Sequence, residues 1–287
     1  MASRSLIVAG NCQSNFLCRA LQESPELSEE YDIIYFRNFR KDNQGELKAK
    51  DVARCALLVE QIAHKAPELP HQQNVPGDCR IIRFPILWGS SLWPTMIDDP
   101  RSMPEPEYPG GRFPYGDRLI LEYLNEGLTP EQAVDRFFAS PLDKLYDLPR
   151  FHELNLKKAE YLDERAEVPL ARDVFDRFTD TKMFDTRNHP TMPLLFELRQ
   201  KIFDAIGVEP PKSDLIDAAG GMGHIQVPVH PSVANYFGLK WYDPNAAHRF
   251  HSEALAAREY YLRYAAYSPV EPVAVPFGEL ELKTGNG

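Results

Sequence analysis

Short apolar runs alternate with helical periodicity over the first 90 residues. Runs of strand length cover residues 6–9, 31–36, 55–62 and 80–85. A helical segment follows the first run and ends by Pro25, its apolar face formed by Phe16, Leu17, Ala20 and Leu21. Near-continuous apolar strands separated by helical segments are typical of a parallel sheet covered on both faces. We therefore predict an α/β fold with a small parallel sheet in the N-terminal part, flanked by helices.

The pattern changes after Trp93. Residues 94–114 hold six prolines and two glycines, and predict a long irregular loop of the kind that can close over a site as a lid. Helical periodicity dominates beyond this loop, and helices are expected over 129–140, 151–166, 170–179, 191–206 and 245–266. We predict one α/β domain over 1–267, in which a strand–helix core (1–93) and the loop (94–114) precede a helix-rich C-terminal part (115–267). The proline-rich tail 268–287 is expected to be extended.

Composition narrows the range of functions. The chain has 32 Lys plus Arg against 42 Asp plus Glu, a net charge of -10, so a nucleic-acid partner is not expected. Apolar stretches are too short for membrane insertion, and the N-terminus lacks a signal peptide, so we expect a cytoplasmic protein. Its thiols should then be reduced. No metal-binding motif occurs, and no metal is predicted.

The strongest local feature follows the first strand, as Gly10-Asn11-Cys12-Gln13. Ligands of open parallel sheets collect at the carboxyl ends of the strands, where this motif stands. A helix N-terminus there would lower the pKa of Cys12 and could stabilise an oxyanion, with amide donors from Asn11 and Gln13. Taken alone, the pattern more often means a small buried thiol beside a helix cap.

A thiol nucleophile needs a base, and His189 stands out among eight histidines. It lies in a turn before a predicted helix, with Asp185 or Asn188 close enough in sequence to fix its tautomer. An ordinary turn histidine fits the spacing as well.

Other polar residues also stand at the carboxyl ends of predicted strands or follow the proline-rich loop. Gln61 closes the third strand and could donate to an acyl oxygen, while Arg83 closes the fourth and could meet a phosphate. Tyr115 and Arg118 follow the proline-rich loop and supply a phenol and a guanidinium. We assign Ser14, Arg83, Tyr115 and Arg118 to cofactor binding, and Gly10, Asn11, Gln13, Gln61 and Asn188 to the oxyanion or substrate. For Gln61 and Arg83, a role as plain sheet-edge residues stays open.

Taken in order, these segments resemble the WcbI-like family of bacterial polysaccharide-biosynthesis proteins. The resemblance rests on Gly10-Asn11-Cys12-Gln13 after the first strand, Gln61 after its own strand, residues 188–191 before a helix, and residues 227–233. It runs from residue 6 to about 240. It implies an enzyme that binds coenzyme A or acetyl-CoA and O-acetylates a saccharide of a capsule or other surface polysaccharide, with polysaccharide-assembly proteins as further partners.

The resemblance also implies a distant kinship with SGNH-type hydrolases. Cys12 stands where those enzymes carry serine, and Asp185-x3-His189 replaces their Asp-x2-His. Cys12, His189 and Asp185 are thus the implied catalytic set. In a covalent version, Cys12 accepts the acyl group and His189 then deprotonates the sugar. In a direct version, His189 activates the hydroxyl and the Cys12 region supplies only oxyanion donors.

Three rival functions stay open. A thiol esterase would use the same residues and pass the acyl group to water. A non-catalytic protein binding coenzyme A or sugar in a polysaccharide-assembly complex would keep Cys12 as an inert core thiol. A glycosyltransferase is less favoured, because no DxD stands at a strand end to hold a nucleotide-sugar metal.

Overall fold

The computed structural model describes residues 4–38, 47–63, 69–108, 110–212 and 223–268 of the 287-residue chain. The predicted tail 268–287 therefore lies outside the described residues except for its first member. The chain forms two compact units. The first combines the residues up to Pro94 with Pro141–Ala256, and the second combines Thr95–Ser140 with the chain from Ala257 onward.

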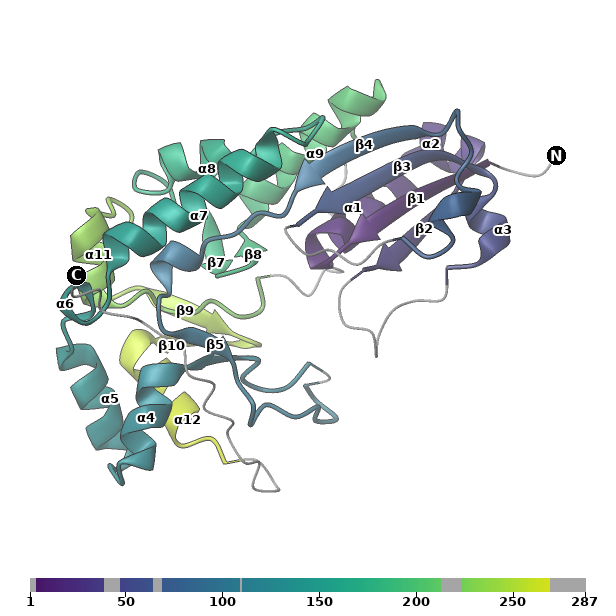
Figure 1. The fold of residues 1–287 in the computed structure, drawn as a ribbon. Coiled ribbons are helices and arrows are strands. Elements are labelled where there is room, and N and C mark those ends of the chain that lie inside the picture. Colours follow the sequence, from purple (N-terminus) through teal and green to yellow (C-terminus); the bar gives the residue numbers. More distant parts are fainter. Residues whose placement is uncertain (1–3, 39–46, 64–68, 109, 213–222, 269–287) are drawn as a thin grey trace. The chain divides into compact units, whose positions relative to one another are not determined.

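A four-stranded parallel sheet is the centre of the first unit. It consists of β1 (Arg4–Gly10), β2 (Tyr31–Arg37), β3 (Cys55–Ile62) and β4 (Arg80–Pro85), in the order β2-β1-β3-β4 (Figure 1). The predicted α/β fold with an N-terminal parallel sheet is confirmed, and the two later strands have the predicted bounds. Because β2 and β3 lie on opposite sides of β1, the connections diverge at β1. Such a divergence makes the carboxyl ends of β1 and β3 the place where this kind of sheet binds ligands.

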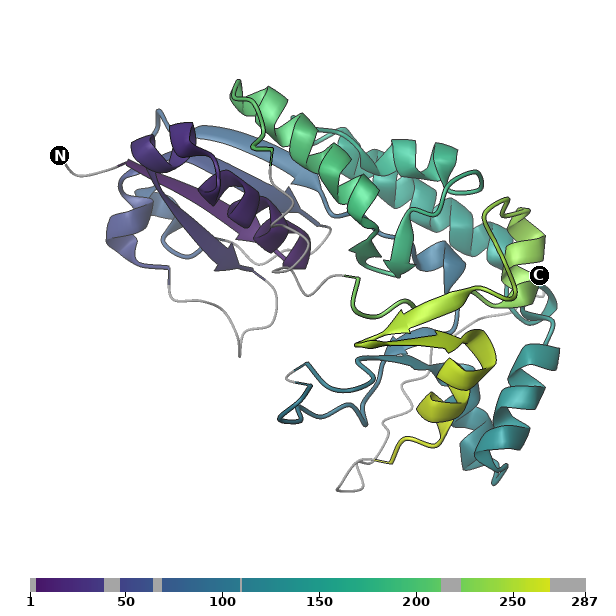
Figure 2. The ribbon, with the colours of Figure 1, turned by 180° about the vertical axis from the view of Figure 1, so that it is seen from behind.

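Helices cover one face of the sheet. Helix α1 (Cys12–Gln22) contacts β1, β2 and α9 (Met192–Ile206), and Figure 2 shows it in front of the strands. The buried apolar side chains of α1 include Phe16, Leu17 and Leu21, as its periodicity predicted. A short helix, α2 (Pro25–Glu30), leads into β2.

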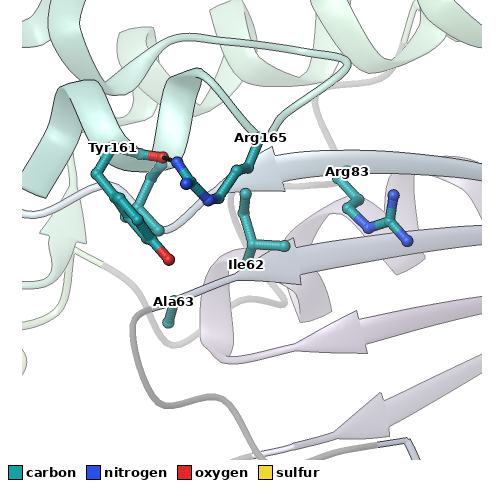
Figure 3. Close-up of a pocket in the computed structure, with 6 residues that line it drawn as sticks. Ile62, Ala63, Arg83, Tyr161 and Arg165 are labelled. Atoms are coloured by element: carbon teal, nitrogen blue, oxygen red, sulfur yellow. Dashed lines mark hydrogen bonds between the residues drawn. The ribbon is translucent and has the colours of Figure 1, made fainter.

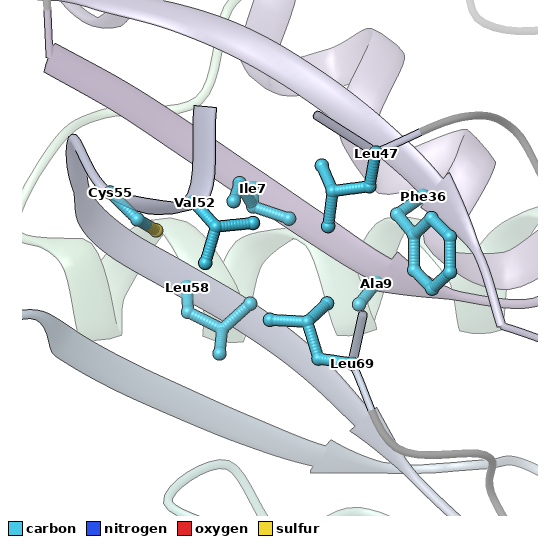
Figure 4. Packing of buried hydrophobic residues seen from close by; sticks show 8 residues of the cluster. All are labelled: Ile7, Ala9, Phe36, Leu47, Val52, Cys55, Leu58 and Leu69. Carbon is cyan, nitrogen blue, oxygen red and sulfur yellow. The ribbon is translucent and has the colours of Figure 1, made fainter. Parts of the chain in front are cut away.

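The other face of the sheet carries a second apolar cluster. Alternate side chains of β1, β2 and β3 pack there against α3 (Ala49–Val52) and its flanking segments (Figure 4). The fully or nearly buried members of this cluster are Ile7, Ala9, Phe36, Leu47, Val52, Cys55, Leu58 and Leu69. The sheet is thus apolar on both faces, which explains the near-continuous hydrophobic runs of its strands.

The rest of the first unit is mainly helical. It contains α6 (Leu142–Leu145), α7 (Leu148–Asp163), α8 (Ala171–Arg177) and α11 (Pro231–Phe237), together with the hairpins β7 (Phe184–Thr186) with β8 (His189–Pro190) and β9 (Ala247–Phe250) with β10 (Glu253–Ala256). Helix α7 contacts the edge strand β4. Among the described residues, no helix is both long and apolar enough to cross a membrane.

The second unit pairs β5 (Met96–Asp98) with β6 (Tyr115–Asp117) in antiparallel fashion. Its helices are α4 (Arg118–Asn125), α5 (Pro130–Ala139) and α12 (Ala257–Ala265). Helix α5 starts with the predicted cap, since Thr129 and Gln132 form a reciprocal capping box. Strand β5 lies inside the segment 94–114 that we predicted to be irregular throughout.

The predicted helix over 245–266 is wrong in its first half. Residues 247–256 form the β9–β10 hairpin, and only 257–265 are helical. The backbone of Gln226 donates to Arg249, and Ile225 forms a bridge with Phe250. Pairing with this remote segment therefore decides the conformation, which local spacing does not reveal.

Candidate functional site

The turn between β1 and α1 is closed too tightly for any side chain at Gly10. Its φ is +155°, and an added Cβ would lie 1.9 Å from Ser14 Oγ and 2.7 Å from Gln61 Cβ. Ser14 is fully buried, and its hydroxyl donates to the carbonyl of Ala9 at 3.3 Å. The absence of a side chain at Gly10 therefore lets α1 start directly against β3. We had assigned Ser14 to cofactor binding, but its hydroxyl has a hydrogen-bond partner within this turn.

Asn11 caps α1 and ties the turn to β3. Its side chain accepts from the backbone N–H of Gln13 at 2.9 Å, and its own N–H donates to Gln61 Oε1 at 3.0 Å. Cys12 is thereby fixed as the first residue of the helix, at the carboxyl end of β1. This is the position predicted for a candidate nucleophile.

Gln13 is the hub of a buried amide network. Its Nε2 donates to the carbonyls of Leu87 (2.9 Å) and Asn188 (3.0 Å). Its Oε1 accepts from Gln61 Nε2 (2.9 Å) and from the N–H of Leu87 (3.1 Å). Both donors and both lone pairs of a fully buried amide are therefore used within the protein. The Gln13 amide therefore has no donor left for an oxyanion, and it holds the surrounding segments together.

Cys12 does not behave as a helix N-terminus alone would predict. Burial of the thiol raises its pKa to about 11, although the N–H groups of Gln13 and Cys12 and the charge of Arg37 act to lower it. Our expectation of a lowered pKa considered the helix end without the desolvation. At pH 7, a pKa of about 11 leaves roughly one thiol in ten thousand ionised.

Sequence reasoning missed two residues beside Cys12, both near the end of β2. Arg37 lies opposite Gly10 in the parallel register, and its charge reaches the Cys12 sulfur. The Tyr35 hydroxyl lies 2.9 Å from the carbonyl of Asn11 and 3.2 Å from that of Gly10, and it also bonds the Arg37 side chain. Burial raises the pKa of Tyr35 to about 12, so the phenol stays protonated. The strand-end rule, applied to β2 as it was to β3 and β4, would have named Arg37.

His189 is brought to this end of the sheet by the Gln13 network. The residue before it, Asn188, accepts from Gln13 through its backbone carbonyl, and Gln13 directly follows Cys12. His189 lies in β8, and its N–H donates to Thr186 Oγ1 at 3.2 Å. Burial and the nearby His224 lower the pKa of His189 to about 4. Its imidazole is therefore neutral at pH 7, and the lowered pKa makes it a weaker proton acceptor than an ordinary histidine.

Asp185, which we named as a candidate to orient His189, lies beside Lys182. This buried carboxylate forms an ion pair with Lys182, with 2.9 Å between Oδ1 and Nζ. Its backbone carbonyl accepts from Val227. The side chain of Asn188 accepts from Thr186 Oγ1 at 3.2 Å, so it stabilises the β7–β8 turn.

Arg83 lies on the other face of the sheet from Gln61. Its Nε donates to Glu60 Oε2 at 3.1 Å, and Glu167 lies 3.6 Å from Nη1. Since Glu60 and Gln61 are successive strand residues, their side chains point to opposite faces. Arg83 borders an open cavity of about 400 Å³ between the strand ends and the α7 region (Figure 3), lined by Ile62, Ala63, Arg83, Tyr161, Leu162 and Arg165. Two carboxylates offset the charge of Arg83, which weakens it as a phosphate ligand.

The remaining two predicted residues belong to the second unit. Tyr115 starts β6, and Arg118 starts α4, where it donates to Glu122 at 2.9 Å. Their assignment to a cofactor stays a prediction. Within the ranges that the structure describes, no group of three or more His, Cys, Asp or Glu residues is placed to hold a metal ion.

Comparison with known proteins identifies the family. The family model described as "Polysaccharide biosynthesis enzyme WcbI" matches residues 5–211. No curated protein matches the chain. Among solved structures, the chain is similar to WcbI, described as a novel polysaccharide biosynthesis enzyme in its native form without a disulfide bond between coenzyme A and a cysteine. The TM-score is 0.62 at 16% sequence identity, covering 92% of this chain and 89% of that chain. The structural likeness shows a shared fold, and since the family match spans well over half of the chain, the chain belongs to the WcbI family of polysaccharide biosynthesis enzymes.

Proposed function

We propose that the protein transfers an acetyl group from acetyl-CoA to a saccharide hydroxyl during surface-polysaccharide synthesis. The observation that carries this proposal is the arrangement at the carboxyl end of β1. A thiol, a helix N-terminus and an arginine meet there, and a neutral histidine is tethered to the same helix end. Family membership supplies the polysaccharide context.

The residues around Cys12 fit a coenzyme A thioester. Arg37 offers positive charge and guanidinium donors, while the Tyr35 hydroxyl donates its proton to the carbonyl of Asn11 and supports the turn. The first turn of α1 adds backbone N–H groups, which favour an anionic ligand. The coenzyme supplies an activated acetyl group and a thiolate leaving group. The solved WcbI is described as a native protein without a disulfide bond between coenzyme A and a cysteine, which names the two groups together. We assign the corresponding place, at the sulfur end of the coenzyme, to Cys12.

Between the two versions of the transfer, the proposed one is direct. Ionising a thiol of pKa about 11 at pH 7 costs about 5 kcal/mol, so Cys12 is a protonated neighbour of the reacting carbonyl and a weak nucleophile. Apart from the N–H of Gln13, which bonds the Asn11 side chain, the N–H groups at the start of α1 are the oxyanion donors in this version. Asn11 and Gly10 set the turn that aims them, and Gln13 and Gln61 hold that turn against β3.

His189 is the proposed general base. A neutral imidazole in a desolvated site accepts the proton of the sugar hydroxyl as the hydroxyl oxygen attacks. Its electrostatic neighbour is His224, whereas the carboxylate of Asp185 is engaged by Lys182. Asp185 is therefore proposed as a structural residue of the β7–β8 hairpin, and not as the orienting member of a triad.

The test is acetyl transfer to a panel of saccharides, followed by release of free coenzyme A thiol and by mass analysis of the sugars. His189→Gln should lower the transfer rate by about 10²–10⁴-fold. The control His71→Asn changes an exposed histidine in a left-handed position that asparagine tolerates, and should leave the rate unchanged. Equal rates for the two variants would remove His189 as the base.

The same assay separates this proposal from its neighbours. Acetate released in place of an acetylated sugar would indicate a thiol esterase. An acetyl adduct on Cys12, found by intact mass after incubation with acetyl-CoA alone, would replace the direct version by the covalent one.

A further inference from the structure

Two cysteines outside the proposed site lie in contact at the amino ends of the strands, away from Cys12. Cys55 is the first residue of β3, and Cys79 directly precedes β4. Their sulfur atoms are 3.6 Å apart, with the Cys79 S–H donating to Cys55 Sγ. Cys12 follows the carboxyl end of β1, whereas this pair lies at the amino ends of β3 and β4. The pair is therefore separate from the candidate site.

The backbone around the pair suits a covalent link. Neighbouring parallel strands lie about 4.8 Å apart, within the Cα separation that a disulfide spans. Leu57 is in register with Arg80, so the two cysteines lie within one residue of direct opposition. The two sulfur atoms need to approach by only about 1.5 Å to reach the length of a disulfide bond.

The two thiols differ in access. Cys55 is buried with 1% of its surface exposed, inside the cluster shown in Figure 4. Cys79 is partly exposed and stands between the exposed residues Asp78 and Arg80. An external reagent therefore reaches Cys79 first, and Cys55 is placed behind it to react second.

We propose that Cys55 and Cys79 form a redox-active dithiol, oxidised to an intramolecular disulfide by a low-molecular-weight disulfide. The Cys79 thiolate attacks one sulfur of the reagent, forms a mixed disulfide and releases one thiol. The Cys55 thiolate then attacks the Cys79 sulfur, forms the Cys55–Cys79 bond and releases the second thiol. The protein loses two electrons and two protons, and one reagent disulfide becomes two thiols.

The surroundings predict how the reaction depends on pH. Burial raises the pKa of both thiols, that of Cys79 to about 12, and the charges of Cys55 and Asp78 act in the same direction at Cys79. Since the thiolate is the reacting form, oxidation should be slow at pH 7 and accelerate as the pH rises.

The test uses the full chain and glutathione disulfide as the reagent. After alkylation of the remaining thiols, peptide mass mapping should find the peptides of Cys55 and Cys79 joined, with a rate that rises about tenfold from pH 7 to pH 8. In Cys55→Ser, the mixed disulfide with glutathione should accumulate on Cys79. The control Cys18→Ser removes a buried thiol of α1 and should give the cross-link at the wild-type yield.

Two outcomes would overturn the proposal. One is a wild-type protein that keeps both thiols free, or that accumulates only the Cys79 adduct, while Cys18→Ser behaves in the same way. The other is a cross-link that forms only after urea has unfolded the chain. Coenzyme A binding is measured in the same samples. Because the pair lies at the amino ends of the strands and Cys12 at their carboxyl ends, the reduced and cross-linked proteins should bind coenzyme A equally. Failure of the redox proposal can thus be distinguished from failure of the proposed acyl transfer.

Discussion

Replacement of Gln13 by leucine separates a structural role of this residue from a role on the substrate. Leucine has a similar volume but cannot replace the four hydrogen bonds of the amide. The buried backbone N–H and carbonyl of Leu87, the buried Gln61 amide and the partly buried carbonyl of Asn188 would then lose their partners. Four bonds at about 0.5–1.5 kcal/mol each correspond to a loss of about 2–6 kcal/mol in the free energy of unfolding. For a chain of this size, that loss lowers Tm by about 3–10 °C.

A matched control lies on the same helix. Gln22, at the far end of α1, donates one exposed hydrogen bond to Ile33 at 3.1 Å. Gln22→Leu should therefore change the free energy of unfolding by no more than about 0.5 kcal/mol. Both variants are measured by urea denaturation and by thermal melting.

The result that refutes this reasoning is equal stability of the two leucine variants. If Gln13→Leu were as stable as Gln22→Leu and lost only coenzyme A affinity or turnover, Gln13 would act on the ligand, as its place in the sequence motif first suggested. The buried amide network would then not be what holds α1, β3 and the 87–88 and 188–189 segments together.

Three further predictions follow from the same end of the sheet. Gly10→Ala should lower the free energy of unfolding in urea by about 3 kcal/mol or more, whereas Gly77→Ala should change it by less than about 1 kcal/mol, because an added Cβ there meets no atom within 4 Å. Similar losses of stability in the two variants would contradict the close contact between position 10 and Ser14. Alkylation of Cys12 by iodoacetamide, followed by peptide mass mapping, should accelerate about tenfold per pH unit from pH 7 to 10, and a plateau near pH 8 would show that the thiol pKa is not raised to about 11. The imidazole of His189 should titrate near pH 4 in NMR spectra, and a midpoint near pH 6.5 would contradict its burial. Because the folded pKa lies below the unfolded value, the stability due to the neutral ring is present above about pH 6.5 and is lost as the pH falls toward 4.

The sheet could be predicted because its strands carry their own signal. The runs Cys55–Ile62 and Arg80–Pro85 are rich in apolar residues on both faces of the sheet, and their bounds coincide with β3 and β4. The hairpin at 247–256 could not be predicted in this way. Its conformation depends on pairing with residues 225–226, more than 20 positions away, and a local pattern holds no information on that partner.

Most residues of the candidate site could be named from the sequence, but their hydrogen bonds and their burial could not. Gln13 and Gln61 were both named, yet the bond between them joins residues 48 positions apart, and the Gln13 donors that we had assigned to a substrate are used by the carbonyls of Leu87 and Asn188. The direction of the Cys12 pKa was wrong, because desolvation depends on what covers the thiol and a helix position alone does not show this. Arg37 could have been found, since it directly follows the predicted strand 31–36, which lies beside the strand that leads to Cys12.

The measurement that tests the central claim most directly is calorimetric titration of the protein with coenzyme A and acetyl-CoA. The wild type should bind both saturably, and Cys12→Ser should retain binding. Arg37→Gln should weaken binding about tenfold or more, as expected for a lost charge-assisted contact. Arg4→Gln, which changes an arginine at the amino end of β1, should match the wild type. No saturable binding to the wild type, or equal affinity of the two arginine variants, would contradict a coenzyme A site beside Cys12.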